Sequence, residues 1–137
     1  MKFVAKMAAI VALTSLSLVA VANAHTVKHD SKVTIQLKKK GQDPDTFSGK
    51  VISDRTRCES DRKVKILRRV EGEDAVLVGK TTTDADGNYE FVLTGEAAPG
   101  TYFAVAKRKI LRQSANHRHV CKRATSADRK VGGVPAL

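Results

Sequence analysis

Residues 81–106, with the sequence TTTDADGNYEFVLTGEAAPGTYFAVA, constrain the fold more than any other stretch of this chain. Polar and apolar residues alternate around two turn signals, Asp86-Gly87 and Pro99-Gly100, as they do in half-buried strands joined by tight turns. An Asp-Gly pair favours a hairpin because glycine adopts the positive φ of such a turn without steric cost. None of these side chains is arranged for catalysis, so the segment is predicted to be scaffold.

Short strands of the same kind are predicted along the rest of the chain, at residues 33–37, 47–52, 63–70, 75–83 and 119–123, with a short edge strand within 125–137. Residues 55–62 interrupt them as a polar loop. About seven short strands separated by frequent turn signals predict an all-β fold, namely an antiparallel β-sandwich. Its core is expected to contain Val33, Ile35, Val64, Ile66, Tyr89, Phe91, Leu93 and Val105.

An export signal is predicted at the amino terminus. Lys2 and Lys6 flank a short charged region, residues 7–22 form an apolar run, and Ala22-Asn23-Ala24 matches the A-x-A pattern of a cleavage site. The run is shorter than the ~20 apolar residues that a membrane-spanning helix needs. We therefore expect a signal-peptide helix at 1–24, cleavage before His25, a secreted or extracytoplasmic protein and no stable membrane span after cleavage.

One domain is expected after cleavage, because residues 25–137 suffice for one hydrophobic core and not for two. We assign an N-terminal strand and linker to 25–45, the β-sandwich to 46–123 and a tail to 124–137. The formal net charge of the whole chain is +11, which falls to +9 once the two lysines of the signal peptide are removed. The mature protein is expected to be a strongly cationic monomer.

The chain has two cysteines, Cys58 and Cys121. An even number of cysteines in an exported protein is expected to be oxidised, so a structural disulfide between them is predicted. Closing so long a loop stabilises a small domain by roughly 4 kcal/mol through the entropy of the unfolded chain. The chain lacks C-x-x-C, and no Cys/His spacing matches a zinc site, so redox and zinc chemistry are not favoured.

Turn and core motifs stand out between residues 46 and 107: Phe47-Ser48-Gly49-Lys50-Val51, Arg62-Lys63-Val64-Lys65-Ile66, Gly79, Thr83-Asp84, Gly87-Asn88-Tyr89 and Pro99-Gly100-Thr101-Tyr102. With the cysteine pair and the basic residues 107–109, this stretch resembles the carboxypeptidase regulatory-like, or transthyretin-like, domain, in its small secreted bacterial form of unknown function. The resemblance implies a prealbumin-like β-sandwich that serves as an accessory or adhesive module.

The resemblance does not extend to an activity. Transthyretin-like hydrolases carry a His-Arg-His-Ser set and end in Tyr-Arg-Gly-Ser, whereas this chain ends in GGVPAL. Collagen-adhesin repeats of related type can crosslink a lysine to an asparagine near a buried acid, and no such trio is assigned here. We therefore predict that the protein is not an enzyme and needs no cofactor.

His25 raises a metal alternative, because cleavage would make it the N-terminal residue. Its amine and imidazole, with a second histidine from His29, His117 or His119, would form a copper brace of the kind seen in some secreted β-sandwich proteins, and imidazole suits copper. However, any residue can follow an A-x-A site, and exposed histidines are common. Copper binding at His25 is therefore an alternative function, and no metal site is assigned.

Asp84, Asp86 and Asn88 offer alternating oxygen atoms of the kind that Ca²⁺ prefers. An EF-hand loop beginning at Asp84 would need glycine at its sixth position and glutamate at its twelfth, where this chain has Tyr89 and Gly95. The segment is therefore interpreted as a hairpin turn.

Basic residues are spread along the chain rather than gathered in one tail, at positions 38–40, 55, 57, 62, 63, 68, 69, 107–109, 112, 122 and 123. A cationic exported domain attracts anionic polymers such as teichoic acid, lipopolysaccharide, acidic polysaccharide or extracellular DNA through a salt-sensitive Coulomb term. A surface that only keeps the protein soluble is the alternative. The candidate anion-binding residues are Lys107, Arg108, Lys109, Arg112, Lys122 and Arg123.

The expected function is a non-catalytic binding or structural module at the cell surface, with an anionic polymer or another extracellular protein as its partner. Specific nucleic-acid recognition is not favoured, because the core is expected to take up the aromatic residues that would stack on bases. The same shortage, in a chain without tryptophan, argues against a sugar-binding platform and leaves carbohydrate binding as a further alternative. The aromatic residues concerned are Phe47, Tyr89, Phe91, Tyr102 and Phe103.

Overall fold

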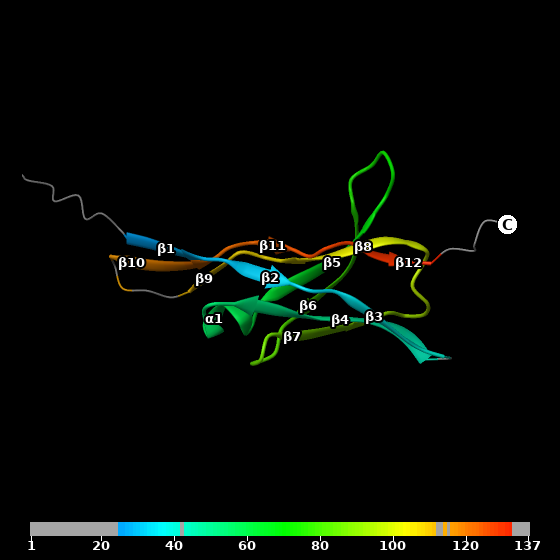
Figure 1. Cartoon of the computed structure of the whole chain (residues 1–137), viewed down its shortest axis with the longest axis horizontal. Coiled ribbons are helices and arrows are strands. Elements are labelled where there is room, and N and C mark those ends of the chain that lie inside the picture. The colour runs from blue at the N-terminus through cyan, green and yellow to red at the C-terminus, as the bar shows by residue number, and fades with distance from the viewer. Residues whose placement is uncertain (1–24, 42, 112–113, 115, 133–137) are drawn as a thin grey trace, which may run out of the picture.

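The computed structural model describes residues 25–41, 43–111, 114, 116 and 117–132, and the predicted signal helix at 1–24 lies outside them. These residues form an all-β fold with one short helix (Figure 1). The elements are β1 His25–His29, β2 Ser31–Val33, β3 Gln36–Lys40, β4 Asp43–Ser53, α1 Thr56–Glu59, β5 Lys63–Arg69, β6 Val76–Thr82, β7 Asn88–Val92, β8 Gly100–Ala106, β9 Lys109–Leu111, β10 His117–Cys121, β11 Ala124–Thr125 and β12 Arg129–Val131.

Two antiparallel layers form the sandwich. In one, the strand order is β11-β8-β5-β6, and β12 also pairs with β8. In the other, the order is β2-β4-β3, and β7 pairs with β4. The predicted antiparallel β-sandwich is therefore confirmed. Its strands are divided into more segments than the sequence indicated. Strands within residues 25–45 and within residues 124–131 pair with strands of the predicted sandwich region, 46–123.

A third, smaller sheet with the order β1-β10-β9 extends from one end of the sandwich (Figure 1). Its first two strands are parallel, with His25 opposite His117 and His29 opposite Cys121. The other strand pairs of the described residues are antiparallel. Strands from the two ends of the sequence thus lie side by side.

The Asp-Gly turn joins the two layers of the sandwich instead of closing a hairpin within one sheet. The strand before it, β6, pairs with β5, whereas the strand after it, β7, pairs with β4. Gly87 has φ of 84°. The Asp84 carboxylate accepts hydrogen bonds from the backbone N–H groups of Asp86 and Asn88, both at 2.9 Å. The turn is where the sequence places it, but the predicted pairing of its flanking strands is wrong, because β6 pairs with β5 and β7 pairs with β4.

The core lies between the two layers and contains most of the residues predicted for it. Val33, Val64, Ile66 and Tyr89 are buried in the core cluster, whereas Val105 is buried but is not part of it. The remaining three, Ile35, Phe91 and Leu93, are partly buried and pack against the core cluster. In the described residues, no helix is long and apolar enough to cross a membrane.

The strand predicted at 33–37 is interrupted at residues 34 and 35. The pairing with β4 has the same register on both sides of the break, with Val33 opposite Val51 and Gln36 opposite Ser48. At the break, the Thr34 carbonyl accepts a hydrogen bond from the Tyr89 hydroxyl at 2.5 Å. The strand is therefore divided at this point because the Thr34 carbonyl is hydrogen-bonded to the side chain of the buried Tyr89.

Gly49→Ala is expected to lower the free energy of unfolding by about 1–3 kcal/mol, the usual cost of overpacking. A Cβ atom at residue 49 would lie 2.0 Å from the Thr34 carbonyl oxygen and 2.6 Å from the Tyr89 hydroxyl. Gly95→Ala is the matched control, because nothing lies within 4 Å of its Cβ position. Urea unfolding of both variants tests the prediction, and equal losses of stability would contradict it.

Candidate functional site

The predicted disulfide between Cys58 and Cys121 is confirmed. The two sulfur atoms are 2.01 Å apart, and both residues are fully buried. The bond joins α1 to the end of β10, across a sequence separation of 63 residues. A disulfide of this kind is typical of an oxidising, extracytoplasmic compartment. It also fixes the small β1-β10-β9 sheet to the sandwich.

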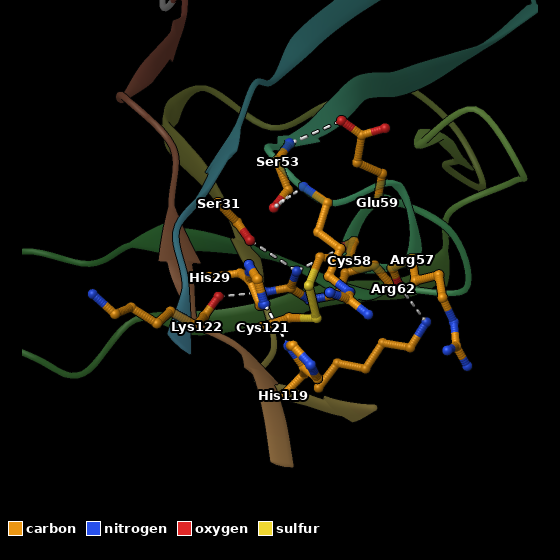
Figure 2. The surroundings of a disulfide bond; sticks show 12 residues. His29, Ser31, Ser53, Arg57, Cys58, Glu59, Arg62, His119, Cys121 and Lys122 are labelled. Atoms are coloured by element: carbon orange, nitrogen blue, oxygen red, sulfur yellow. Dashed lines mark hydrogen bonds between the residues drawn. A yellow bond between two sulfur atoms is a disulfide. The ribbon is translucent and has the colours of Figure 1, made fainter. Parts of the chain in front are cut away.

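Arg62 is fully buried beside this disulfide, although the sequence grouped it with the basic surface residues (Figure 2). Its Nε donates to the Lys107 carbonyl at 2.6 Å, and its Nη1 donates to the Cys58 carbonyl at 2.8 Å. Nη1 also donates to the Ser31 hydroxyl at 3.0 Å, and Nη2 donates to the Lys122 carbonyl. Among the described residues, no carboxylate pairs with this guanidinium. Burial lowers the pKa of Arg62.

These acceptors come from four different segments, so one guanidinium joins β2, α1 and the chain just after β8 and β10. Within residues 55–62, which the sequence predicted to be a loop throughout, the structure has the helical turn α1.

Lys109 also has a structural role, because its Nζ donates to the carbonyls of Arg57 at 3.0 Å and Ser60 at 2.7 Å. The pKa of Lys109 is lowered, chiefly by burial. The disulfide, Arg62 and Lys109 thus connect the small sheet to α1 and to the segments around it.

The parallel β1-β10 pair has two faces of different chemistry. Side chains alternate between the faces of a strand, and the register sets equivalent positions beside each other. His25, His29, His117 and His119 therefore share one face, which we call the histidine face. The opposite face, which we call the basic face, carries Thr26, Lys28, Arg118 and Val120.

The histidine face brings together all four histidines of the chain. His29 Nε2 and His119 Nδ1 are 2.8 Å apart (Figure 2). Ring centroids are separated by 5.5 Å between His25 and His117, and by 4.6 Å between His117 and His119. His29 Nδ1 lies 3.4 Å from Oδ1 of Asp54. The pKa of His119 is lowered by desolvation and by nearby positive charge.

The copper brace considered from the sequence required the amine of His25. In the structure, the backbone nitrogen of His25 donates to the Asn116 carbonyl at 2.9 Å. As the side chains lie, no three histidine, cysteine or carboxylate groups within the described part of the chain form a metal-binding set. The gathering of the four histidines could not be inferred from the sequence, because it depends on the parallel pairing of two distant strands.

The basic face is hollowed. A cavity of about 360 Å³ is lined by cationic side chains from β1, β10 and the two connections that follow β8 and β10. We call it the basic hollow; its lining residues are Thr26, Lys28, Arg108, Arg118, Val120, Lys122 and Arg123. Three of the predicted anion-binding residues, Arg108, Lys122 and Arg123, are thus brought together.

Other predicted anion-binding residues lie elsewhere. Lys107 lines a second hollow of about 300 Å³ together with Lys63, Lys65 and Lys80. Lys109 donates to one carbonyl of α1 and to the carbonyl of the residue that follows it, and Arg112 lies outside the described residues. Lys28 and Arg118 were missed, because their place beside the predicted residues follows from strand pairing and from no local motif.

Few acidic groups compensate the charge of the basic hollow. Lys122 Nζ lies 2.7 Å from Asp30 Oδ1, and this contact lowers the pKa of the Asp30 carboxyl. Both side chains are largely exposed, so the pair is weak. The other four cations, Lys28, Arg108, Arg118 and Arg123, form no ion pair with any carboxylate of the described residues. The hollow therefore presents mostly uncompensated positive charge.

No protein-family model matches this chain, and no curated protein matches it. The surfaces themselves are therefore the basis for any functional assignment.

A third, polar hollow of about 600 Å³ is lined mainly by hydroxyl, amide and charged side chains of β3, β4, β6 and β7. Its aromatic residue, Tyr89, is 2% exposed and donates its hydroxyl proton to Thr34, so its ring is not available for stacking on a sugar. This arrangement does not favour the carbohydrate alternative.

Proposed function

We propose that this protein is an exported, non-catalytic β-sandwich module that binds an anionic polymer at the cell surface in its basic hollow. The observation that carries the proposal is the convergence of five cationic side chains, of which one is paired with an acid, in a single concave surface. The resemblance to transthyretin-like accessory domains supports it, as does the excess of positive charge over the whole chain.

A polymer suits this surface better than a small anion. The hollow is open, and its cations are carried on long, solvated side chains, so each interaction with a phosphate, sulfate or carboxylate group is weak on its own. A repeating polyanion presents many such groups and releases condensed counterions when it binds. The second cluster of lysines around Lys107 allows a long ligand to interact beyond the hollow. The ligand class is thus a flexible surface polymer with repeated negative charges.

The double substitution Lys28→Gln and Arg118→Gln is expected to weaken binding to heparin and to inorganic polyphosphate more than the removal of two charges outside the basic hollow. The logarithm of affinity falls with the logarithm of salt concentration, and this slope should become shallower by roughly one for each cation that no longer neutralises a polymer charge. Salt elution from heparin and fluorescence titration with polyphosphate measure both quantities.

The matched control is the double substitution Lys39→Gln and Lys130→Gln. These lysines are exposed on β3 and β12, outside the basic hollow, and the substitution removes the same net charge. The control should change affinity and salt dependence little. Equal weakening in the two double variants would show that overall charge, and not the hollow, governs binding.

A further inference from the structure

We propose that His29 and His119 form a binding site for one late divalent transition-metal ion, with His117 as a third donor, and that Cu(II) is bound most tightly. This site is on the opposite face of the β1-β10 pair from the basic hollow. It is independent of the proposed polymer binding. It also differs from a copper brace, because it does not use the amine of His25.

The spacing of the two imidazole nitrogens is suitable for a shared metal ion. His29 Nε2 and His119 Nδ1 are 2.8 Å apart. Two nitrogens bound at ~2.0 Å and at right angles to each other around one ion would be separated by about 2.8 Å, as in the tetragonal geometry of Cu(II). A metal ion would replace the proton that the two rings share, after each ring has turned by about 45°, so that its lone pair points at the ion and no longer at the other nitrogen.

Asp54 places a negative charge beside the first of these ligands. Its carboxylate lies 3.4 Å from Nδ1 of His29, while Nε2 of the same ring faces His119. A metal-ligating histidine commonly has a carboxylate near its second nitrogen. At 3.4 Å the contact is longer than a hydrogen bond, so Asp54 contributes favourable charge to the site and does not fix the tautomer of His29. The His29 side chain is confined, with 11% of it exposed.

His117 can complete the set. Its ring centroid is 4.6 Å from that of His119, and its side chain is exposed, so it can turn toward the ion without disturbing the core. The strands that carry the ligands are held in register by the β1-β10 ladder, and Cys121, two residues after His119, is fixed by the disulfide. The site is therefore partly preformed, and the third ligand is recruited when the ion binds.

The ligand atoms determine the metal class. Imidazole nitrogens suit Cu, Zn and Ni, and the affinity of such sites rises to a maximum at Cu(II). Ca²⁺ and Mg²⁺ prefer oxygen ligands, so they should not compete. Two nearby arginines, Arg55 and Arg57, add positive charge close to His119. Their repulsion weakens the site, and Asp54 offsets part of it.

The test is a titration of the purified protein with Cu(II) and with Zn(II), followed by calorimetry and, for copper, electron paramagnetic resonance. We expect one Cu(II) per chain, bound more tightly than Zn(II), with nitrogen hyperfine splitting from at least two imidazoles. The variants His29→Gln and His119→Gln should each bind copper at least about tenfold more weakly, because loss of even an outer-shell partner typically costs 10–100-fold.

Two matched controls separate this site from its alternatives. Lys28→Gln changes the basic face of the same strand and should keep copper binding, while His25→Gln removes the histidine that a copper brace would need and should also keep it. The proposal is overturned if His25→Gln alone abolishes binding, if His29→Gln and His119→Gln both retain it, or if the wild-type protein shows no imidazole nitrogens at copper. The last measurement needs no variant, so a variant that fails to fold does not affect it.

Discussion

Arg62→Met is expected to lower the free energy of unfolding by about 3–5 kcal/mol, because several buried acceptors lose their donor at roughly 1–3 kcal/mol each. Methionine fills a similar volume but has no donor. The carbonyls of Cys58, Lys107 and Lys122 and the hydroxyl of Ser31 would then lose a buried partner. Each buried acceptor left without a hydrogen bond costs roughly 1–3 kcal/mol, less where water can reach it. Urea unfolding measures the loss.

Lys63→Met is the matched control, because it removes the same charge from the neighbouring residue, whose side chain is exposed. It should change stability by less than about 0.5 kcal/mol. Arg62→Lys should lie close to Arg62→Met, since one ammonium group cannot reach acceptors that surround a planar guanidinium. If Arg62→Met and Lys63→Met were equally stable, the buried guanidinium would not support the surrounding segments.

Replacing both Cys58 and Cys121 with alanine is expected to lower the free energy of unfolding by about 4 kcal/mol, the chain-entropy value for a loop of this length. The loss should also be uneven across the molecule. The disulfide holds β10, and β1 is attached through β10, so both strands should open more readily than the core strands β4 and β5. Amide hydrogen exchange resolves this difference, and urea unfolding gives the total.

The oxidised and reduced forms of the unaltered protein provide the comparison for this double variant. Reduction should reproduce both the loss of stability and the faster exchange in β1 and β10. A change in stability below about 1 kcal/mol, well under the range typical of a native disulfide, or an equal rise in exchange in all strands, would contradict the role assigned to the disulfide.

The sandwich itself was largely predictable, because its signals are local. Alternation at β5 and β7 placed Val64, Ile66 and Tyr89 in the core, and the glycine of the Asp84–Asn88 turn indicated its position. The pairing of the strands was less predictable. The turn at Gly87 has the sequence of a hairpin, yet its flanking strands belong to different layers, since pairing depends on partners far away in the chain.

The candidate sites were predictable in composition and not in arrangement. Arg108, Lys122 and Arg123 were expected to bind anions, but nothing local indicated that Lys28 and Arg118 would join them. Arg62 was predicted to belong to the basic surface, but it is buried. Its neighbour Lys63 is exposed and the segment before it is polar, so the sequence around it is that of a solvated turn. The burial of Arg62 depends on four carbonyl and hydroxyl groups, three of which come from segments far away in the sequence.

The parallel pairing of β1 with β10 has a consequence for the order of folding. His29 and His119 meet across 90 residues of sequence, so this contact closes a loop that contains nearly the whole sandwich. Contacts of such high sequence separation form slowly, because the entropy of closing the loop is lost before the contact stabilises anything. We therefore expect β1 to dock after the sandwich has assembled. The histidine face and the basic hollow would then appear together, as the last step of maturation, and copper binding would report that a molecule has completed it.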